Sequence, residues 1–270
     1  MVVQHNLTAM NSNRQLGITT SAQAKSSEKL SSGYRINRAG DDAAGLSISE
    51  KMRSQIRGLN KASDNAADGI SLIQTAEGAL NETHSILQRM NELATQAAND
   101  TNTTVDRDAI AAEMSQLKEE INRIQSTTQF NTMNLLDGSF TGKKLQIGAL
   151  NGQTMSISIT QMSASKIGLT SIAVSSNTTA GTTMKAVQDA IKSVSDQRSK
   201  LGAIQNRLEH TIANLDTTSE NTSAAESRIR DTDMADEMVS YSKNNILAQA
   251  GQSMLAQANQ STQGVLSILG

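Results

Sequence analysis

Three long stretches of the chain repeat apolar and small residues, with a few polar ones among them, at alternating spacings of three and four, and this pattern limits the folds open to the chain. The stretches span residues 56–98, 110–124 and 184–215. The spacing is the heptad-like pattern of helices that pack side by side. Because one helix cannot cover its own apolar stripe, we expect the three to form an elongated bundle.

The chain contains no proline, although average usage would place roughly 13 in 270 residues. Proline interrupts helices by removing a hydrogen-bond donor and clashing with the preceding turn. Aromatic residues make up only 1% of the chain. Since compact globular cores draw much of their burial from large rings, we expect aliphatic and small side chains packed along close helix interfaces instead of a rounded enzyme core.

Charge, cysteine content and hydropathy exclude several classes of protein. The net charge of −2 provides no basic field for nucleic acid or anionic lipid. The lack of cysteine removes disulfides, thiolate metal sites and cysteine nucleophiles. Residues 1–6 lack the pattern of a secretory signal peptide, and no apolar run reaches the ~18 residues of a membrane span. These signals alone favour a cytoplasmic protein without nucleic-acid or membrane partners.

The period changes from helical to strand spacing in the middle of the chain. Met155, Ile157 and Ile159 alternate with serines, and Asn151-Gly152 just before them is a strong hairpin signal. We therefore predict a small β region over residues 138–175.

The two ends of the chain are similar in kind. Residues 1–35 and 234–270 both scatter apolar side chains among many small and polar residues. Helices of this type are marginal alone in water, because tertiary packing normally stabilises them. They could order against neighbouring copies of the chain, or they could form an ordinary intramolecular coiled pair.

The sequence offers no catalytic or cofactor motif. His5, His84 and His210 are dispersed and lack metal-ligand spacing, and His84 on the apolar stripe is expected to be a partly buried packing residue. There is no nucleophile elbow, P-loop or dinucleotide fingerprint. The segment 231–237 resembles the start of a calcium loop but carries Asp236 where glycine is required, which favours helix-start carboxylates. We expect no enzyme activity, cofactor or metal.

Several motifs resemble those of bacterial flagellins. Residues 30–37 (LSSGYRIN) and 41–46 (DDAAGL) are similar to the family's N-terminal signature. Residues 125–136 are similar to the segment where its second outer helix ends, and residues 246–260 to its terminal helix. The resemblance covers about residues 1–150 and 180–270, with the motifs in the family's order.

This resemblance implies a structural subunit of the flagellar filament that serves motility. In flagellins the two chain ends pair as a coiled coil lining the central channel, the heptad helices form a surrounding tube, and a variable insert faces outward. That insert is reduced here to the β region. The resemblance also implies type III export to the cell exterior, and as partners other copies of the chain, an export chaperone, and cap and junction proteins.

The resemblance and the apolar pattern together indicate the residues of polymerisation. They are Leu7, Met10, Arg35, Asp41, Asp42, Ile246, Leu247, Met254, Leu255, Leu266 and Leu269. Asp41-Asp42 with Arg35 could form ion pairs between subunits or a solvated turn, where surface ion pairs contribute about 0–1 kcal/mol.

A second candidate site lies in the first apolar stripe. Residues 88–93 resemble the segment through which flagellins contact an animal Toll-like receptor, and the matching positions are Gln88, Arg89, Leu93 and Glu113. The family's usual basic residue is Asn91 here. In the alternative interpretation, Leu93 belongs to the core and Arg89 is an exposed charge used in filament contacts.

The predicted fold is mainly α, with heptad-patterned helices, a small β-hairpin region and terminal coiled-coil helices. We assign residues 1–42 and 231–270 to a terminal polymerisation domain, 43–137 and 176–230 to a helical rod, and 138–175 to the β region. A hook–filament junction protein is the alternative within the family. A chemoreceptor-like signalling hairpin is disfavoured by the β interruption at residues 145–160 and the lack of a membrane span.

Overall fold

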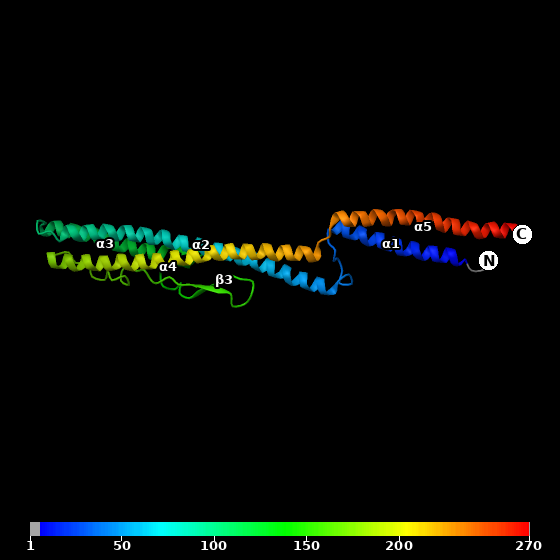
Figure 1. The fold of residues 1–270 in the computed structure, drawn as a ribbon. Coiled ribbons are helices and arrows are strands. Elements are labelled where there is room, and N and C mark those ends of the chain that lie inside the picture. The colour runs from blue at the N-terminus through cyan, green and yellow to red at the C-terminus, as the bar shows by residue number, and fades with distance from the viewer. Residues whose placement is uncertain (1–5, 270) are drawn as a thin grey trace. The chain divides into compact units, whose positions relative to one another are not determined.

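The computed structural model of the protein describes residues 6–269, with side chains described through residue 261. It is mainly α-helical, as predicted (Figure 1). The helices are α1 (Leu7–Ser32), α2 (Ala43–Ala97), α3 (Thr104–Thr127), α4 (Asn177–Arg230) and α5 (Met234–Leu269). The strands are β1 (Gln129–Phe130), β2 (Met133–Asn134), β3 (Lys143–Gln146) and β4 (Thr154–Ile157).

The chain divides into two compact units. The terminal unit comprises Met1–Ser54 with Asn221–Gly270, and the central unit comprises Gln55–Glu220. The terminal unit therefore contains the first turns of α2 and the last turns of α4 in addition to α1 and α5. The functional boundaries assigned from the sequence, at residues 42 and 231, stay a prediction.

In the terminal unit, α1 and α5 pair with each other (Figure 1). Asn6 caps the start of α1 by accepting the N–H of Ala9 at 3.0 Å, and Gly33 ends it with φ +76°. Glycine suits this left-handed position because it has no Cβ. Asp233 accepts the N–H groups of Ala235 and Asp236 at the start of α5. The acidic segment near residue 233 is thus a helix start, as predicted.

In the central unit, the apolar stripes of α2, α3 and α4 form a main core, and Leu59 and Leu215 belong to a second, smaller cluster. On α2 a strict seven-residue repeat is buried, and so is the corresponding repeat on α4. The α2 members are Leu59, Ala66, Ile73, Leu80, Leu87 and Ala94; the α4 members are Val187, Val194, Leu201, Leu208 and Leu215. This repeat is the one that keeps a seam facing its neighbours along a long helix.

The other half of the predicted α2 stripe lies at the margin of the core. Ile70, Glu77 and His84 are half-buried, and Glu77 pairs with Arg198 at 3.4 Å. The second fully buried set is instead Ala62, Ala76, Met90 and Ala97. Three of these four positions carry alanine.

The turn between α2 and α3 leads into a capping box at the start of α3. The Thr103 side chain accepts the N–H of Asp106 at 3.3 Å, while Asp106 accepts the N–H of Thr103 at 2.9 Å. This reciprocal capping box satisfies donors that a helix start otherwise leaves free.

The predicted hairpin is present as β3 and β4, paired antiparallel from Lys143↔Ile157 to Gln146↔Thr154. The strand ends at Ile157, earlier than predicted, but Ile159 remains buried and donates its N–H to the Phe140 carbonyl at 2.8 Å. The loop before β4 lies close to α2. A Cβ at Gly58 would stand 2.9 Å from the Cβ of Ala149, so glycine permits this approach.

A second short hairpin, β1–β2, falls outside the predicted β region. Asn131 and Thr132 both have positive φ, at 46° and 64°, and they form its two-residue turn. Positive φ at both central positions matches the primed turns of tight hairpins. Threonine is unusual there, which explains why the sequence pattern did not reveal this turn.

Candidate assembly surface and charged cluster

The terminal unit leaves large apolar side chains exposed to solvent. Leu7 is 70% exposed and Ile246 is 67% exposed. The set, which we call the terminal seam, comprises Leu7, Met10, Ile18, Met238, Val239, Ile246, Leu247 and Met254. On α1 the only buried residue is Ser26. The pairing of α1 with α5 therefore covers little of the apolar surface of either helix.

A groove of about 390 Å³ runs between α1 and α5 beside this seam, lined among others by Leu16, Leu247 and Met254. Gly251 faces Leu16, whose Cδ1 would lie 3.3 Å from a Cβ at that position. The side chain of Leu16 on α1 thus packs against a glycine of α5. Leu255 is half-buried. Leu266 and Leu269 lie outside the residues with described side chains.

The charged residues of the N-terminal signature make contacts within the chain. The Asp41 carboxylate accepts the N–H groups of Arg38 at 3.0 Å and Asn37 at 3.3 Å, and the bond from Arg38 is the main reason that the pKa of Asp41 is lowered. Asp42 accepts the N–H of Gly45 at 2.8 Å and so caps the start of α2. In the single chain these two residues therefore form a hydrogen-bonded turn and a helix cap.

Arg35 lies where the segment after α1 meets the end of α4. We call this contact, between residues 33–35 and residues 229–232, the joint. The N–H of Arg35 donates to the Arg230 carbonyl at 2.6 Å, and the N–H of Thr232 donates to the Gly33 carbonyl at 3.0 Å. The Arg35 guanidinium also donates to the Ile229 carbonyl. The sequence did not indicate this joint, because Arg35 and its partner Ile229 are 194 positions apart.

Arg230 strengthens the same joint. Its guanidinium lies 4.7 Å from the centre of the Tyr34 ring, a cation–π distance, and 3.4 Å from the Glu50 carboxylate. Tyr34 in the LSSGYRIN motif is thus held from one side by the end of α4.

The second candidate site forms an exposed cluster on α2 and α3. Arg89 donates to Glu113 through both Nε and Nη2 at 3.0 Å, and to Glu92 at 3.2 Å. The hydrogen bond that Arg89 donates to Glu113 is the main cause of the raised pKa of Arg89. The structure thus brings together two predicted residues that are 24 positions apart.

The other two predicted residues of this site differ in exposure. Gln88 is exposed and contacts His84 on the preceding turn. Leu93 is only 2% exposed and packs in the central core. Leu93 therefore supports the helix from beneath, while Gln88, Arg89 and Glu113 present the accessible groups.

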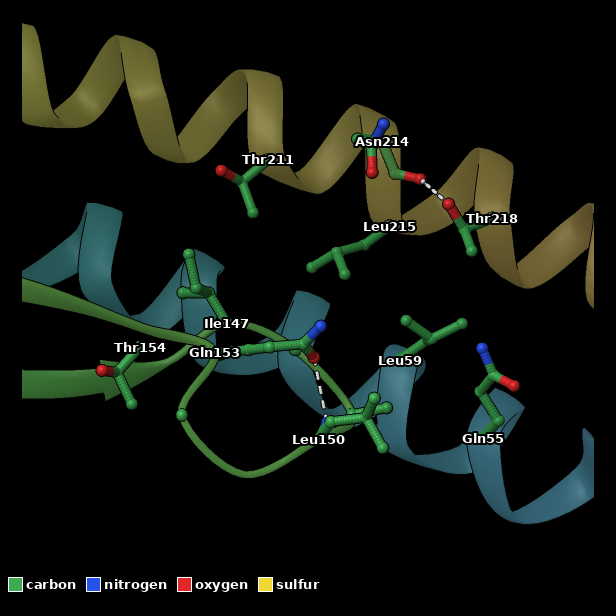
Figure 2. A pocket seen from close by; sticks show the side chains of 13 residues that line it. Gln55, Leu59, Ile147, Leu150, Gln153, Thr154, Thr211, Asn214, Leu215 and Thr218 are labelled. Carbon is green, nitrogen blue, oxygen red and sulfur yellow. Dashed lines mark hydrogen bonds between the residues drawn. The ribbon is translucent and has the colours of Figure 1, made fainter. Parts of the chain in front are cut away.

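A hollow in the central unit offers no catalytic chemistry. It measures about 360 Å³ and lies between α2, α4 and the loop before β4 (Figure 2). Leu59, Leu150 and Leu215 contribute apolar surface, and the remaining lining groups are neutral. No ionisable side chain lines it. Within the described part of the chain, no three potential metal ligands gather, and no helix has the length and apolar character to cross a membrane.

Fold and surface together define a helical protein whose accessible features are uncovered helix faces and a charged cluster. The sequence matches the family model of the bacterial flagellin N-terminal helical region over residues 3–141 and that of the C-terminal helical region over residues 184–269. The chain belongs to the bacterial flagellin family.

Similar proteins span its full length. A flagellin of Halalkalibacterium halodurans is 57% identical over 271 residues, covering all of both chains. The flagellar filament 31.3 kDa core protein of Treponema maltophilum is 51% identical over 285 residues, again covering both completely. The crystal structure of Bacillus cereus flagellin aligns with 60% of this chain and 94% of its own, at 32% identity and a TM-score of 0.52.

Proposed function

We propose that the chain is a structural subunit that polymerises into the extracellular filament of the bacterial flagellum. The observation that carries this proposal is the terminal seam on α1 and α5, where apolar side chains such as Met10 and Ile246 stay in water. Several large apolar side chains left exposed on the same pair of helices favour an interaction site. Relatives of the full length are named as flagellins and as filament core proteins.

The magnitude of the hydrophobic effect supports assembly through this seam. Fully covering one large apolar side chain stabilises by about 1.5–3 kcal/mol. Association costs roughly 4–15 kcal/mol in lost translational and rotational freedom. One or two covered residues would not suffice, but a seam extending along both terminal helices would.

We propose that residues 1–42 and 231–270 form the polymerisation domain, residues 43–137 and 176–230 the rod, and residues 138–175 the β region.

Truncation after Met254 tests the proposal. It removes the end of α5 and leaves the central unit intact. We expect the truncated monomer to keep the cooperative unfolding of its central unit but to form no filaments when salted or seeded, as seen by light scattering and electron microscopy. Filaments of normal length from the truncated protein would overturn the proposal.

We further propose that the Arg89–Glu113 cluster is a contact site for an animal Toll-like receptor. A planar guanidinium with several donors is a common hot-spot group in protein interfaces. Arg89 is half-exposed and already oriented by Glu113 and Glu92. Arg89→Ala is expected to weaken the receptor response of cultured reporter cells, whereas Arg123→Ala, which removes an exposed arginine of α3, leaves it unchanged. Equal responses from both variants would contradict this proposal.

We also propose that the subunit leaves the cell through type III export and that an export chaperone and cap or junction proteins are partners of the same terminal helices. The apolar side chains exposed on α1 and α5 would promote premature association, so a chaperone that binds these helices would keep the subunit monomeric before assembly. Purified chaperone is expected to slow proteolysis of α5 in the monomer. The names of the full-length relatives favour a filament flagellin over a junction protein.

A further inference from the structure

The loop between β3 and β4 carries the only Asn-Gly pair in the sequence, Asn151-Gly152. Both residues are exposed. The N–H of Gln153 bonds to the Leu150 carbonyl at 3.3 Å, and Gly152 has φ +87°. A turn closed in this way, with positive φ only at its third residue, is a type II turn. Asn151 and Gly152 are therefore its two central residues.

The peptide group joining Asn151 to Gly152 is not engaged by the rest of the fold. The closing hydrogen bond uses the N–H of Gln153 and the carbonyl of Leu150, leaving the central peptide group outside it. Among the hydrogen bonds of the described residues, none uses the Asn151 carbonyl, the Gly152 N–H or the Asn151 carboxamide. A Cβ built on Gly152 would meet nothing within 4 Å, so the surroundings are open. This peptide group can rotate without breaking a tertiary contact.

We propose that Asn151 is a site of non-enzymatic deamidation in the folded protein. The Gly152 nitrogen attacks Cγ of Asn151, forming a new C–N bond and a five-membered succinimide. The bond from Cγ to the carboxamide nitrogen breaks, and that nitrogen leaves as ammonia, with the Gly152 proton passing to it through solvent. Water then opens the ring at either carbonyl, producing an aspartate or an isoaspartate.

The other asparagines of the chain lack this combination. Asn11 precedes a small residue, Ser12, but both lie in α1, where helix hydrogen bonds hold the backbone nitrogen. Asn131 lies in an exposed turn, but Thr132 follows it with a β-branched side chain that obstructs attack. Asn151 alone joins an exposed turn to a following glycine.

The reaction alters a tightly held loop. Gln146 donates to the carbonyls of Gly148 at 2.7 Å and Leu150 at 2.8 Å. Gln153 accepts the N–H of Leu150 at 2.9 Å (Figure 2). Ala149 is pressed against Gly58. An isoaspartate adds one methylene to the main chain within this loop, so the hydrogen bonds that Leu150 makes with Gln146 and Gln153 must readjust.

Either product also places a new carboxylate at the loop. Asn151 and Lys61 line the same hollow beside α2, and Lys61 currently pairs with Asp64 at 3.5 Å across a solvated surface. Deamidation at Asn151 therefore accumulates with the age of the protein and changes both the charge and the backbone of this loop. The inference concerns the single chain and does not depend on polymerisation.

Peptide mapping of the full-length monomer tests it. The chain is held in warm, mildly alkaline buffer, digested with trypsin and analysed by mass spectrometry. Isoaspartate is scored separately with an isoaspartyl methyltransferase and labelled S-adenosylmethionine. The peptide 145–166 contains a single asparagine, Asn151, and three glutamines, so fragment-ion spectra are used to assign the mass gain to Asn151. We expect this peptide to deamidate several-fold faster than any other, and faster as the pH rises.

Two controls make the result decisive. Asn151→Gln is expected to remove most of the isoaspartate, and the matched loop variant Asn131→Gln to leave it unchanged. We also expect the peptide to react in the folded protein at a rate within a few-fold of that in denaturant. The inference is overturned if folding suppresses the reaction strongly or if Asn151→Gln retains the isoaspartate.

Discussion

At the scale of single residues, a few short-range hydrogen bonds decide where the helices of this flagellin begin. Thr103 and Asp106 satisfy each other's backbone N–H groups at the start of α3. The hydrogen bond from the Thr103 hydroxyl is the main cause of the lowered pKa of Asp106. Both observations point to a cap that depends on the charged carboxylate.

Thr103→Ala is expected to destabilise the protein by about 0.5–2 kcal/mol, since it removes an N-cap side chain. The neighbouring Thr104→Ala, which leaves the cap intact, is expected to change little. Urea unfolding followed by circular dichroism measures both. Equal stability of the two variants would contradict the role of the cap.

The same cap is expected to depend on pH. The folded-state pKa of Asp106 lies below its ordinary value. Its contribution is therefore fully present above the ordinary aspartate pKa and is lost as the pH falls through the lowered one. The difference in stability between wild type and Asp106→Asn should accordingly be larger at neutral pH than in acid. A difference that stayed constant down to strong acid would show that the charge plays no part.

Single residues of the terminal seam are expected to affect assembly without affecting folding. Ile246→Ser removes an apolar group that is exposed in the monomer, so its unfolding should hardly change. If burial of Ile246 between copies contributes about 1.5–3 kcal/mol, the critical concentration for polymerisation rises about ten- to hundredfold. Sedimentation of polymer against protein concentration measures this, with the exposed polar Gln252→Ser as the matched control. No rise for Ile246→Ser would exclude this residue from the interface.

At the scale of elements, the glycines of α2 illustrate how the helix accepts its neighbours. Gly58 lies against Ala149, whereas a Cβ on Gly78 would meet nothing within 4 Å. Both positions are helical, so alanine would gain the same helix propensity at each. Comparing alanine at the two positions therefore separates the effect of packing against the loop from the effect of helix propensity.

Gly78→Ala is expected to stabilise the central unit by about 0.4–1 kcal/mol through the unfolded state. Gly58→Ala must displace the loop before β4, and overpacking of this kind costs about 1–3 kcal/mol. Urea midpoints of the two variants should therefore move in opposite directions. An increase in the urea midpoint of both variants would show that the loop before β4 can move away from α2 at little cost in free energy.

At the scale of the whole molecule, the two compact units differ in how much apolar surface they bury. The central unit contains a continuous core from α2, α3, α4 and the β region, whereas α1 and α5 bury little. Regions with few buried contacts open locally at low free energy cost.

Limited proteolysis of the monomer is therefore expected to remove α1 and α5 first and to leave a fragment close to residues 55–220. In the polymer the same helices should be protected, since neighbouring copies cover them. Mass spectrometry of the fragments tests both statements. Resistant ends in the isolated monomer would favour a closed helical hairpin over an assembling subunit.

Local patterns in the sequence correctly predicted much of this architecture. The heptad spacing located α2, α3 and α4, and Asn151-Gly152 located the β3–β4 hairpin. The acidic segment near residue 233 was a capped helix start. These features were predictable because helix periodicity, capping and turn formation involve residues only a few positions apart.

Contacts between distant positions came only from the tertiary structure. The heptad pattern left open whether Leu93 was core or surface, and packing of α2 against its neighbours buried it. The Arg89–Glu113 pair required α3 to fold back on α2, and the Tyr34–Arg230 contact required both ends of the chain to meet. Periodicity specifies that a helix has an apolar face, whereas three-dimensional packing specifies which neighbour covers that face and which part remains exposed.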